Sequence, residues 1–416
     1  MNARRLTGST FAALRVRNFR LYFIGQLISV SGTWMQSVAQ GWLILQMTGS
    51  SVGLGVAVAL QYVPMLLLGF YGGLVVDRHE KRRILYVTQS SAGVLALGLA
   101  ILVGTGHVRV DEVYGFALLL GIVNLFDTPA RQAFVQEMVG RDLITNAVSL
   151  NSVLMNAGRL IGPSVAAIFI AVAGMASSFY ANAVSFAAVI VALAMMRAED
   201  FVPMATVERA RGQIMIGLRY VLRTVLVRDV VLAVAVVGTF AFNFTVTLPL
   251  LARTTFDQHS AAQYGLLMSA MGLGAVLGGL FVARRSRATP RLLAILSLGF
   301  GGFMTLVALA PSLWWAAVAL VPTGAFSIAF AATANATLQL NSSPEMRGRV
   351  MSLYGTAFLG TTPIGALAVG ALVGATNPRV GLLAGAVLTL AVGAWLVSVR
   401  TRREAPASEL VENYAG

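Results

Sequence analysis

Long apolar runs recur along the whole chain and limit what it can fold into. Each run is long enough to cross a hydrocarbon core of about 30 Å as an α-helix. They are continuously apolar rather than alternating, and lipid leaves no water to satisfy an open strand edge, so helices are expected. The predicted spans are residues 19–46, 52–76, 84–104, 112–135, 147–173, 176–197, 229–252, 262–283, 290–310, 313–338, 350–374 and 379–400. The sequence therefore predicts an all-α membrane protein with twelve transmembrane helices.

Charge is scarce and is sorted by side. Only 11% of the 416 residues are charged, against about 25% in soluble globular chains. Of the 30 Lys and Arg residues, Arg109, Arg253 and Arg379 fall in predicted loops on one side, Arg159 falls inside a span, and the rest fall on the other side. Because cytoplasmic loops collect Lys and Arg, we expect a multi-pass protein of a bacterial cell (inner) membrane with both termini in the cytoplasm. The net charge of +14 then reflects topology, and no nucleic-acid partner is expected.

The second half of the chain repeats features of the first. Gly72-Gly73-Leu74 after the second span corresponds to Gly278-Gly279-Leu280 after the eighth, at an offset of 206 residues. Repeats at half the chain length predict two pseudo-symmetric six-helix bundles, a transporter design with its site at their interface. The predicted domains are an N-terminal bundle (1–197), a cytoplasmic linker with an amphipathic helix on the anionic inner leaflet (198–228), a C-terminal bundle (229–400) and a cytoplasmic tail (401–416).

The loop after the second span resembles a motif of the major facilitator superfamily, G-x-L-a-D-R-x-G-R-K. The chain matches it at Gly73, Asp77, Arg78, Lys81, Arg82 and Arg83, and departs from it at Val75 and Glu80. The resemblance implies a latch that closes the cytoplasmic side, with Asp77 contacting the start of the eleventh span near Arg349. An acid held by Arg side chains and a helix N-terminus is physically sound. The alternative is that the basic residues only enforce topology.

The fifth span resembles the antiporter motif of the same superfamily, g-x-x-x-G-P-x-x-G-G. The stretch GRLIGPSVAA supplies Gly158, Gly162 and Pro163, with Ala166 and Ala167 in place of the last two glycines. Small residues four apart let helix backbones approach closely, and Pro bends a helix. The resemblance implies export of a drug or metabolite in exchange for protons.

Two further stretches are similar to one exporter subgroup, which includes macrolide efflux proteins and the enterobactin exporter. They are D-x-P-A-R-Q at Asp127–Gln132 and P-E-x-R-G-R-V-M-S at Pro344–Ser352.

Asp127 and Arg159 lie well inside predicted spans, and Arg131 lies near the cytoplasmic end of the fourth span. Asp127 and Arg131 share one helical face with Asn124, and Arg159 lies near the middle of the fifth span. A charge at the bilayer centre costs at least about 2.5 kcal/mol, so this face is expected to point into the bundle or a wet crevice. Two roles remain open for Asp127: proton coupling tuned by Arg131 and Arg159, or a static pair that gates or ties helices.

Uncharged polar residues follow one face of the first span, which predicts a wet cavity or, alternatively, hydrogen bonds between helices. Trp34 is suited to stack on an aromatic or cationic substrate, unless it only packs. Pseudo-symmetry adds positions in spans seven and ten. The candidate cavity residues are Gln26, Thr33, Trp34, Gln36, Gln40, Asn124, Asn243 and Asn335.

Other function classes find little support. The only Lys is Lys81, so a phosphate-binding G-K-[ST] loop and an ATP-driven pump are excluded for this chain. The three His residues are scattered among loops. No metal, cofactor or enzyme activity is therefore expected. We expect a monomeric, proton-coupled exporter of a small amphiphile, a drug or a siderophore-like metabolite, whose partners are its substrate, protons and the lipid bilayer. A lipid or lysolipid flippase and a nutrient symporter remain alternatives.

Overall fold

The computed structural model describes residues 11–202, 213–283 and 288–404, and the structured part of these ranges is helical throughout. Four short turns accompany the helices: η1 (Ala12–Arg15) and η2 (Ala198–Asp200) are 3₁₀, and η3 (Leu251–Thr255) and η4 (Thr356–Gly360) are π-helical. The α-helices are α2 (Arg17–Thr48), α3 (Ser51–Arg78), α4 (Lys81–Thr105), α5 (Val110–Ala173), α6 (Met175–Met195), α7 (Gln213–Arg223), α8 (Val225–Phe240), α9 (Phe244–Leu250), α10 (Ala261–Ala283), α11 (Pro290–Leu309), α12 (Leu313–Asn341), α13 (Pro344–Gly355), α14 (Thr362–Ala375) and α15 (Pro378–Glu404).

The predicted fold class is confirmed. Within the described ranges, 11 helical segments are long and apolar enough to cross a membrane, and α2, with 32 residues, covers the predicted first span. The helices do not match the predicted spans one to one. α5 contains two spans, Val110–Gly140 and Asp142–Ala173. The seventh span runs through α8, α9 and η3, and the eleventh through α13, η4 and α14.

Gly140 separates the two spans of α5. Its φ of 69° and ψ of −178° lie in a region that essentially only glycine adopts, because any Cβ would clash there. The chain can therefore reverse direction between the fourth and fifth spans without a long loop. One continuous stretch of sequence thus supplies two walls of the same bundle.

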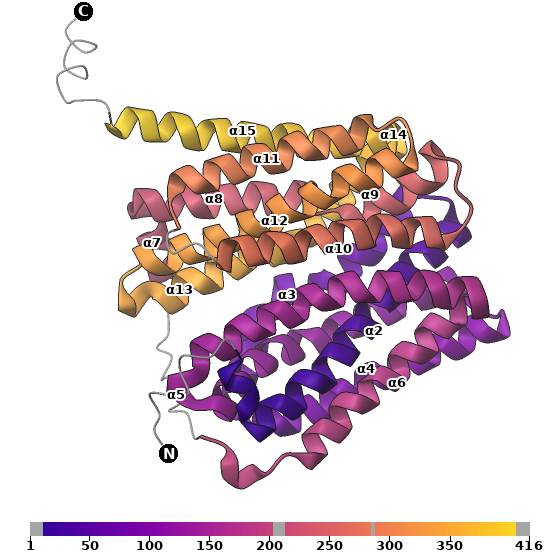
Figure 1. Ribbon diagram of the computed structural model, residues 1–416, viewed down its shortest axis with the longest axis horizontal. Coiled ribbons are helices and arrows are strands. Elements are labelled where there is room, and N and C mark those ends of the chain that lie inside the picture. The colour runs from indigo at the N-terminus through magenta and orange to yellow at the C-terminus, as the bar shows by residue number, and fades with distance from the viewer. Residues whose placement is uncertain (1–10, 203–212, 284–287, 405–416) are drawn as a thin grey trace, which may run out of the picture.

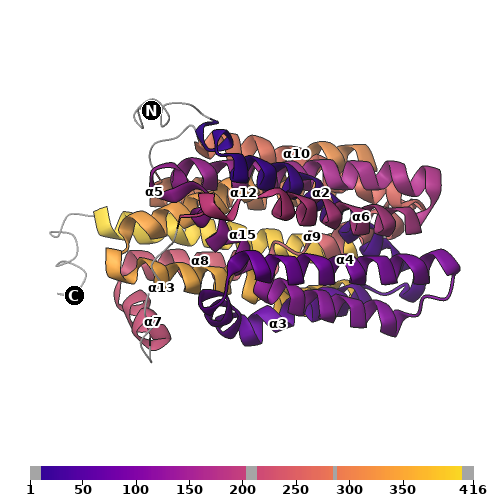
Figure 2. The same cartoon turned by 90° about the horizontal axis from the view of Figure 1, so that it is seen from below.

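The helices form two groups that lie side by side. Figure 1 shows α2–α6 in one group and α8–α15 in the other, and Figure 2 shows the same molecule turned by 90°. We call the end where α2 begins and α15 ends the near end, and the opposite end, where α2 ends and α15 begins, the far end. The groups meet along the second span of α5 with α10, and along α3 with α14.

Helices within each group approach closely at small residues. A Cβ added to Gly274 in α10 would overlap the carbonyl oxygen of Val321 in α12. Such contacts matter in a membrane because lipid tails are as apolar as the side chains, so association relies on close packing and hydrogen bonds. The α10–α12 seam therefore depends on the absence of a side chain at Gly274.

We predict that Gly274→Ala lowers the apparent Tm of the detergent-purified protein by several degrees, because overpacking costs about 1–3 kcal/mol. Gly115→Ala in α5 is the matched control, since no atom lies within 4 Å of a Cβ placed there. The control should leave the Tm unchanged or raise it slightly, as Ala favours helix over Gly by about 1 kcal/mol. Equal Tm values for the two variants would contradict this packing.

Candidate functional site

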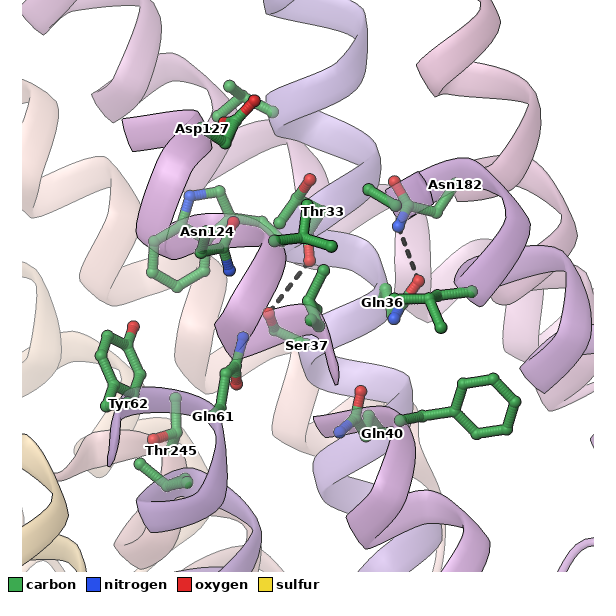
Figure 3. Close-up of a pocket in the computed structure, with 18 of the residues that line it drawn as sticks. Thr33, Gln36, Ser37, Gln40, Gln61, Tyr62, Asn124, Asp127, Asn182 and Thr245 are labelled. Atoms are coloured by element: carbon green, nitrogen blue, oxygen red, sulfur yellow. Dashed lines mark hydrogen bonds between the residues drawn. The ribbon is translucent and has the colours of Figure 1, made fainter. Parts of the chain in front are cut away.

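A cavity of about 250 Å³ lies among the helices of the first group. α2, α3, α4, α5 and α6 form its wall, and Thr245 of α9 reaches it from the second group. Figure 3 shows Asp127 on one side of the view and Gln40 and Thr245 on the other. Its polar lining residues are Ser29, Thr33, Gln36, Ser37, Gln40, Gln61, Tyr62, Gln89, Asn124, Asp127, Arg131, Asn182 and Thr245.

The polar face of α2 is fixed by local and cross-helix hydrogen bonds. Ser37 Oγ donates to the Thr33 carbonyl oxygen at 3.0 Å, a common arrangement for a hydroxyl in a helix. Asn182 Nδ2 in α6 donates to Gln36 Oε1 at 2.6 Å. This face of α2 therefore both lines a cavity and forms hydrogen bonds between helices, because Gln36 does both.

Asp127 is the centre of a buried polar network. Its side chain is 2% exposed, and its Oδ1 accepts hydrogen bonds from Thr88 Oγ1 at 2.8 Å and Gln89 Nε2 at 2.7 Å. Its Oδ2 forms an ion pair with Arg131 Nη2, one turn further along α5. Arg131 Nη1 donates to Gln26 Oε1 of α2 at 2.9 Å. A charge taken out of water is tolerated when it is paired and hydrogen-bonded, and this carboxylate is both.

The network has unused polar atoms at both ends. Gln26 Nε2 and Gln89 Oε1 are buried and have no hydrogen-bond partner within the described ranges. A carboxylate only accepts hydrogen bonds, whereas a protonated carboxyl group also donates one. Protonation of Asp127 would therefore remove the counter-charge of Arg131 and reverse one hydrogen bond. The arrangement is chemically able to couple one proton to a rearrangement of α2, α4 and α5.

Arg159 lies apart from this network. Its guanidinium carbon lies 4.8 Å from the ring centroid of Trp34, and the structure does not bring it to Asp127. Among the described residues, Arg159 has neither an ion pair nor a hydrogen bond through its side chain. Spacing places Arg131 on the same helical face as Asp127, whereas the depth of Arg159 in its span does not specify its neighbours.

The small residues of the predicted antiporter-like motif join three helices. A Cβ on Gly162 would lie 2.5 Å from the Ser31 carbonyl oxygen, and one on Gly158 would lie 2.5 Å from Val30 Cγ1. Both glycines therefore allow α5 to approach α2. Pro163, one residue after Gly162, has its carbonyl oxygen beside Gly265 of α10. This part of α5 thus contacts both its own group and the other one.

The predicted gate residues lie at the near end. Gly73, Asp77 and Arg78 occupy the end of α3. Arg82 donates to the Leu193 and Met196 carbonyl oxygens, and a cation at a helix C-terminus is favourable there.

Arg349, the expected partner of Asp77, has its described contacts within α13 and α7. Its Nη1 lies 3.1 Å from Met346 Sδ, and its side chain lies beside Gly217. The latch between Asp77 and Arg349 therefore stays a prediction.

The predicted cavity residues divide by helix group. Thr33, Trp34, Gln36, Gln40 and Asn124 line the cavity, and Gln26 binds Arg131 behind it.

Asn243 and Asn335 lie outside this lining. Asn243 Nδ2 donates to the Thr239 carbonyl oxygen, and Asn335 Oδ1 accepts from Gln339 Nε2. The cavity belongs mainly to the first group; of the positions in the seventh span suggested by pseudo-symmetry, Thr245 lines it and Asn243 does not. Sequence reasoning missed Gln61, Tyr62, Gln89 and Asn182, although each stands as a polar residue inside an apolar run.

Two hydrogen bonds to backbone carbonyl oxygens link the helix groups at the far end. Arg253 Nη1 of η3 donates to the Leu45 carbonyl oxygen of α2 at 2.6 Å. Ser51 Oγ of α3 donates to the Gly370 carbonyl oxygen of α14 at 2.8 Å. Each bond joins one helix group to the other. The two groups are therefore tied together where α2 ends and α3 begins.

The described residues contain no cluster of His, Cys, Asp and Glu that could hold a metal ion.

The family of transmembrane secretion effectors matches residues 8–413. The chain belongs to this family. The family is a branch of the major facilitator superfamily, whose members are transporters and not enzymes, and the chain is accordingly a multi-pass membrane protein.

Individual relatives are distant but cover nearly the whole chain. The multidrug efflux pump Tap of Mycolicibacterium fortuitum is 27% identical over 92% of this chain and 96% of its own length. The enterobactin exporter EntS of Escherichia coli is 27% identical over 93% of this chain and 94% of its own length. A solved structure of a POT family transporter in complex with a thioalcohol-conjugated peptide superposes with a TM-score of 0.74 at 12% identity, over 93% and 96% of the two chains. At that identity the superposition shows the shared fold alone.

We predict that Arg131→Met destabilises this secretion effector by about 3–5 kcal/mol, because it leaves the buried charge of Asp127 unpaired. The double variant Asp127→Leu with Arg131→Met should be closer in stability to the parent than the single variant is, since no charge then remains buried. Unfolding of the purified proteins by titration with SDS gives the free energies of the parent, the single variant and the double variant. A double variant that is no more stable than Arg131→Met would contradict the coupling of the pair.

Proposed function

We propose that this protein is a secondary active transporter that exports a small amphiphilic molecule in exchange for protons. The single observation that carries the proposal is the ion pair of Asp127 and Arg131 in the wall of the cavity. Ionisable residues inside a membrane span are expensive and usually mark a transport path or proton relay. Relatives named as an enterobactin exporter and a multidrug efflux pump support export of a siderophore or drug.

The unequal distribution of Lys and Arg between the loops of the two ends supports one orientation of the protein in the membrane. Lys and Arg gather in the loops of the near end, so this end lies in the cytoplasm together with both termini. α7 fits a linker helix on the inner leaflet, because Met215, Ile216 and Leu222 are exposed on a helix that also carries Arg219 and Arg223. The far end then faces outward.

We further propose that residues 1–197 and 229–400 move as two bodies around the cavity, in an alternating-access cycle. The bonds of Arg253 and Ser51 would hold the outward side closed in the conformation described above. In the opposite conformation these bonds break, and the latch between Asp77 and Arg349 forms at the near end. Each bond is worth little alone, so the two conformations stay close in free energy.

Proton exchange follows from the chemistry of the Asp127 network. A proton on Asp127 removes the counter-charge of Arg131, whose other terminal nitrogen binds Gln26 of α2. Loss of the proton restores the ion pair. A proton entering from the acidic side and leaving on the other would thereby change how the cavity wall is held at each step.

A lipid flippase would need a lateral entry into the cavity. An apolar groove of about 320 Å³ does lie between α2, α5 and α6, with Ile28, Ile161 and Phe169 in its lining. It shares no lining residue with the cavity, and the close packing at Gly158 and Gly162 separates the two. The separation of this groove from the cavity therefore favours the exporter over the flippase.

The first test measures proton movement in inside-out membrane vesicles that hold a pH gradient. Addition of erythromycin or enterobactin should dissipate the gradient with the parent protein, and Asp127→Asn should slow the dissipation by about tenfold or more, as loss of a proton-transfer group typically does. Asp257→Asn is the control, because Asp257 is an exposed acid at the far end and Asn tolerates its positive φ of 53°. Equal dissipation by the parent and Asp127→Asn would make Asp127 a structural residue.

The second test concerns the outward side. The chain contains no Cys, so Gln40→Cys introduces a single reactive thiol in the cavity. Removing one charge-assisted hydrogen bond shifts a two-state equilibrium by about tenfold. Arg253→Gln should therefore raise the rate at which a membrane-impermeant maleimide labels this thiol on whole cells by about that factor. Arg109→Gln, whose ion pair with Asp111 stays within the first group, should leave the rate unchanged. An unaltered rate in Arg253→Gln would remove it from the gate.

A further inference from the structure

We propose that Arg159 and Trp34 form an anion-binding subsite of the cavity, so that the transported amphiphile carries an acidic group such as a carboxylate. The proposal rests on the exporter function above and names the class of its substrate. It starts from Arg159, which lies well inside the span Asp142–Ala173 and takes no part in the pair at Asp127. Within the described ranges, none of its N–H donors has a hydrogen-bond acceptor, and no carboxylate is paired with it.

Arg159 is not itself a lining residue of the cavity, but its neighbours are. Its guanidinium lies over the ring of Trp34, which lines the cavity. Met155, one helical turn earlier on the same face of α5, also lines the cavity. Tyr62 of α3, another lining residue, is close enough to interact electrostatically with Arg159. Three neighbours on three different helices therefore border both Arg159 and the cavity.

The charges of the wall leave Arg159 unbalanced. Asp127 and Arg131 offset each other through their ion pair, so Arg159 gives this region a net positive charge. A cation removed from water is unfavourable without a partner of opposite charge. The contact with Trp34 offers only part of that compensation, because a ring face attracts a cation weakly. A substrate anion would supply the missing partner.

The geometry of the guanidinium specifies which anion fits. Arg presents five N–H donors in a planar fork that matches the two oxygens of a carboxylate. The contact with the ring of Trp34 uses no acceptor atom, so the donors remain available. The remaining wall includes the apolar side chains of Leu54, Val58, Phe116 and Leu120. An acidic head at Arg159 and an apolar body along this wall together describe an anionic amphiphile.

Arg159 also belongs to a stretch of α5 that packs against the second group. Its carbonyl oxygen lies beside Gly272 of α10, where a Cβ would approach it to 2.6 Å. An anion bound by its guanidinium can bias one arrangement of the groups over the other, provided the anion interacts differently with the two arrangements.

The test compares two matched probes on the purified full-length protein. Isothermal titration calorimetry measures the Kd of 1-naphthaleneacetate and of its uncharged analogue 1-naphthaleneethanol. The parent should bind the carboxylate at least about tenfold more tightly than the alcohol, as expected for a charge-assisted bond. Arg159→Gln should abolish this preference and leave the affinity for the alcohol within about twofold. Arg223→Gln, an exposed position of α7, should change neither Kd.

Three results would overturn the proposal: equal affinity of the parent for the two probes, no binding of the carboxylate, or a preference for the carboxylate that survives in Arg159→Gln. Retained alcohol binding shows that Arg159→Gln is folded. If that variant binds neither probe, Arg159→Lys, which keeps the charge without the planar fork, must still prefer the carboxylate. Repeating the titrations with Asp127→Asn separates the two proposals, because the preference needs no proton exchange and proton exchange can fail while the preference remains.

Discussion

The ion pair between Asp127 and Arg131 is the interaction on which the first helix group depends. Two charges in adjacent turns of an apolar helix cannot face lipid, so α5 must turn this face inward. Once inside, the carboxylate needs hydrogen-bond donors, which α4 provides, and the guanidinium needs an acceptor, which α2 provides. The pair therefore fixes the rotation of one helix and the registers of two others, and the cavity lies where these three helices meet.

Small residues provide a second set of contacts that hold the helices together. Lipid gives little driving force for apolar helices to associate, so close backbone contact has to supply it. Gly158 and Gly162 bring α5 against α2, and the same helix meets α10 beside Pro163 and Arg159. The second span of α5 thus contacts both the group that holds most of the cavity and the other group.

The sequence predicts the fold and the location of the charged site, but not the contacts within the site. Span number follows from apolar length, and the inward face of Asp127 follows from the cost of exposing a charge to lipid. Thr88 and Gln26, which bind the pair, lie on other helices, and a single sequence does not reveal which helices pack together. The same limit applies to Arg159, whose aromatic neighbour lies on α2. Of the positions that the notion of two similar halves suggests, Thr245 lines the cavity whereas Asn243 and Asn335 do not, because the lining comes mainly from the first half.

The two bonds that close the far end have a further consequence for how the protein responds to its surroundings. Arg253 and Ser51 donate to backbone carbonyl oxygens, not to carboxylates. Neither acceptor titrates, and the Arg side chain stays charged at any ordinary pH. The strength of this closure is therefore insensitive to the acidity of the medium that it faces. The two hydrogen bonds at the far end can therefore persist equally well in acidic and neutral environments.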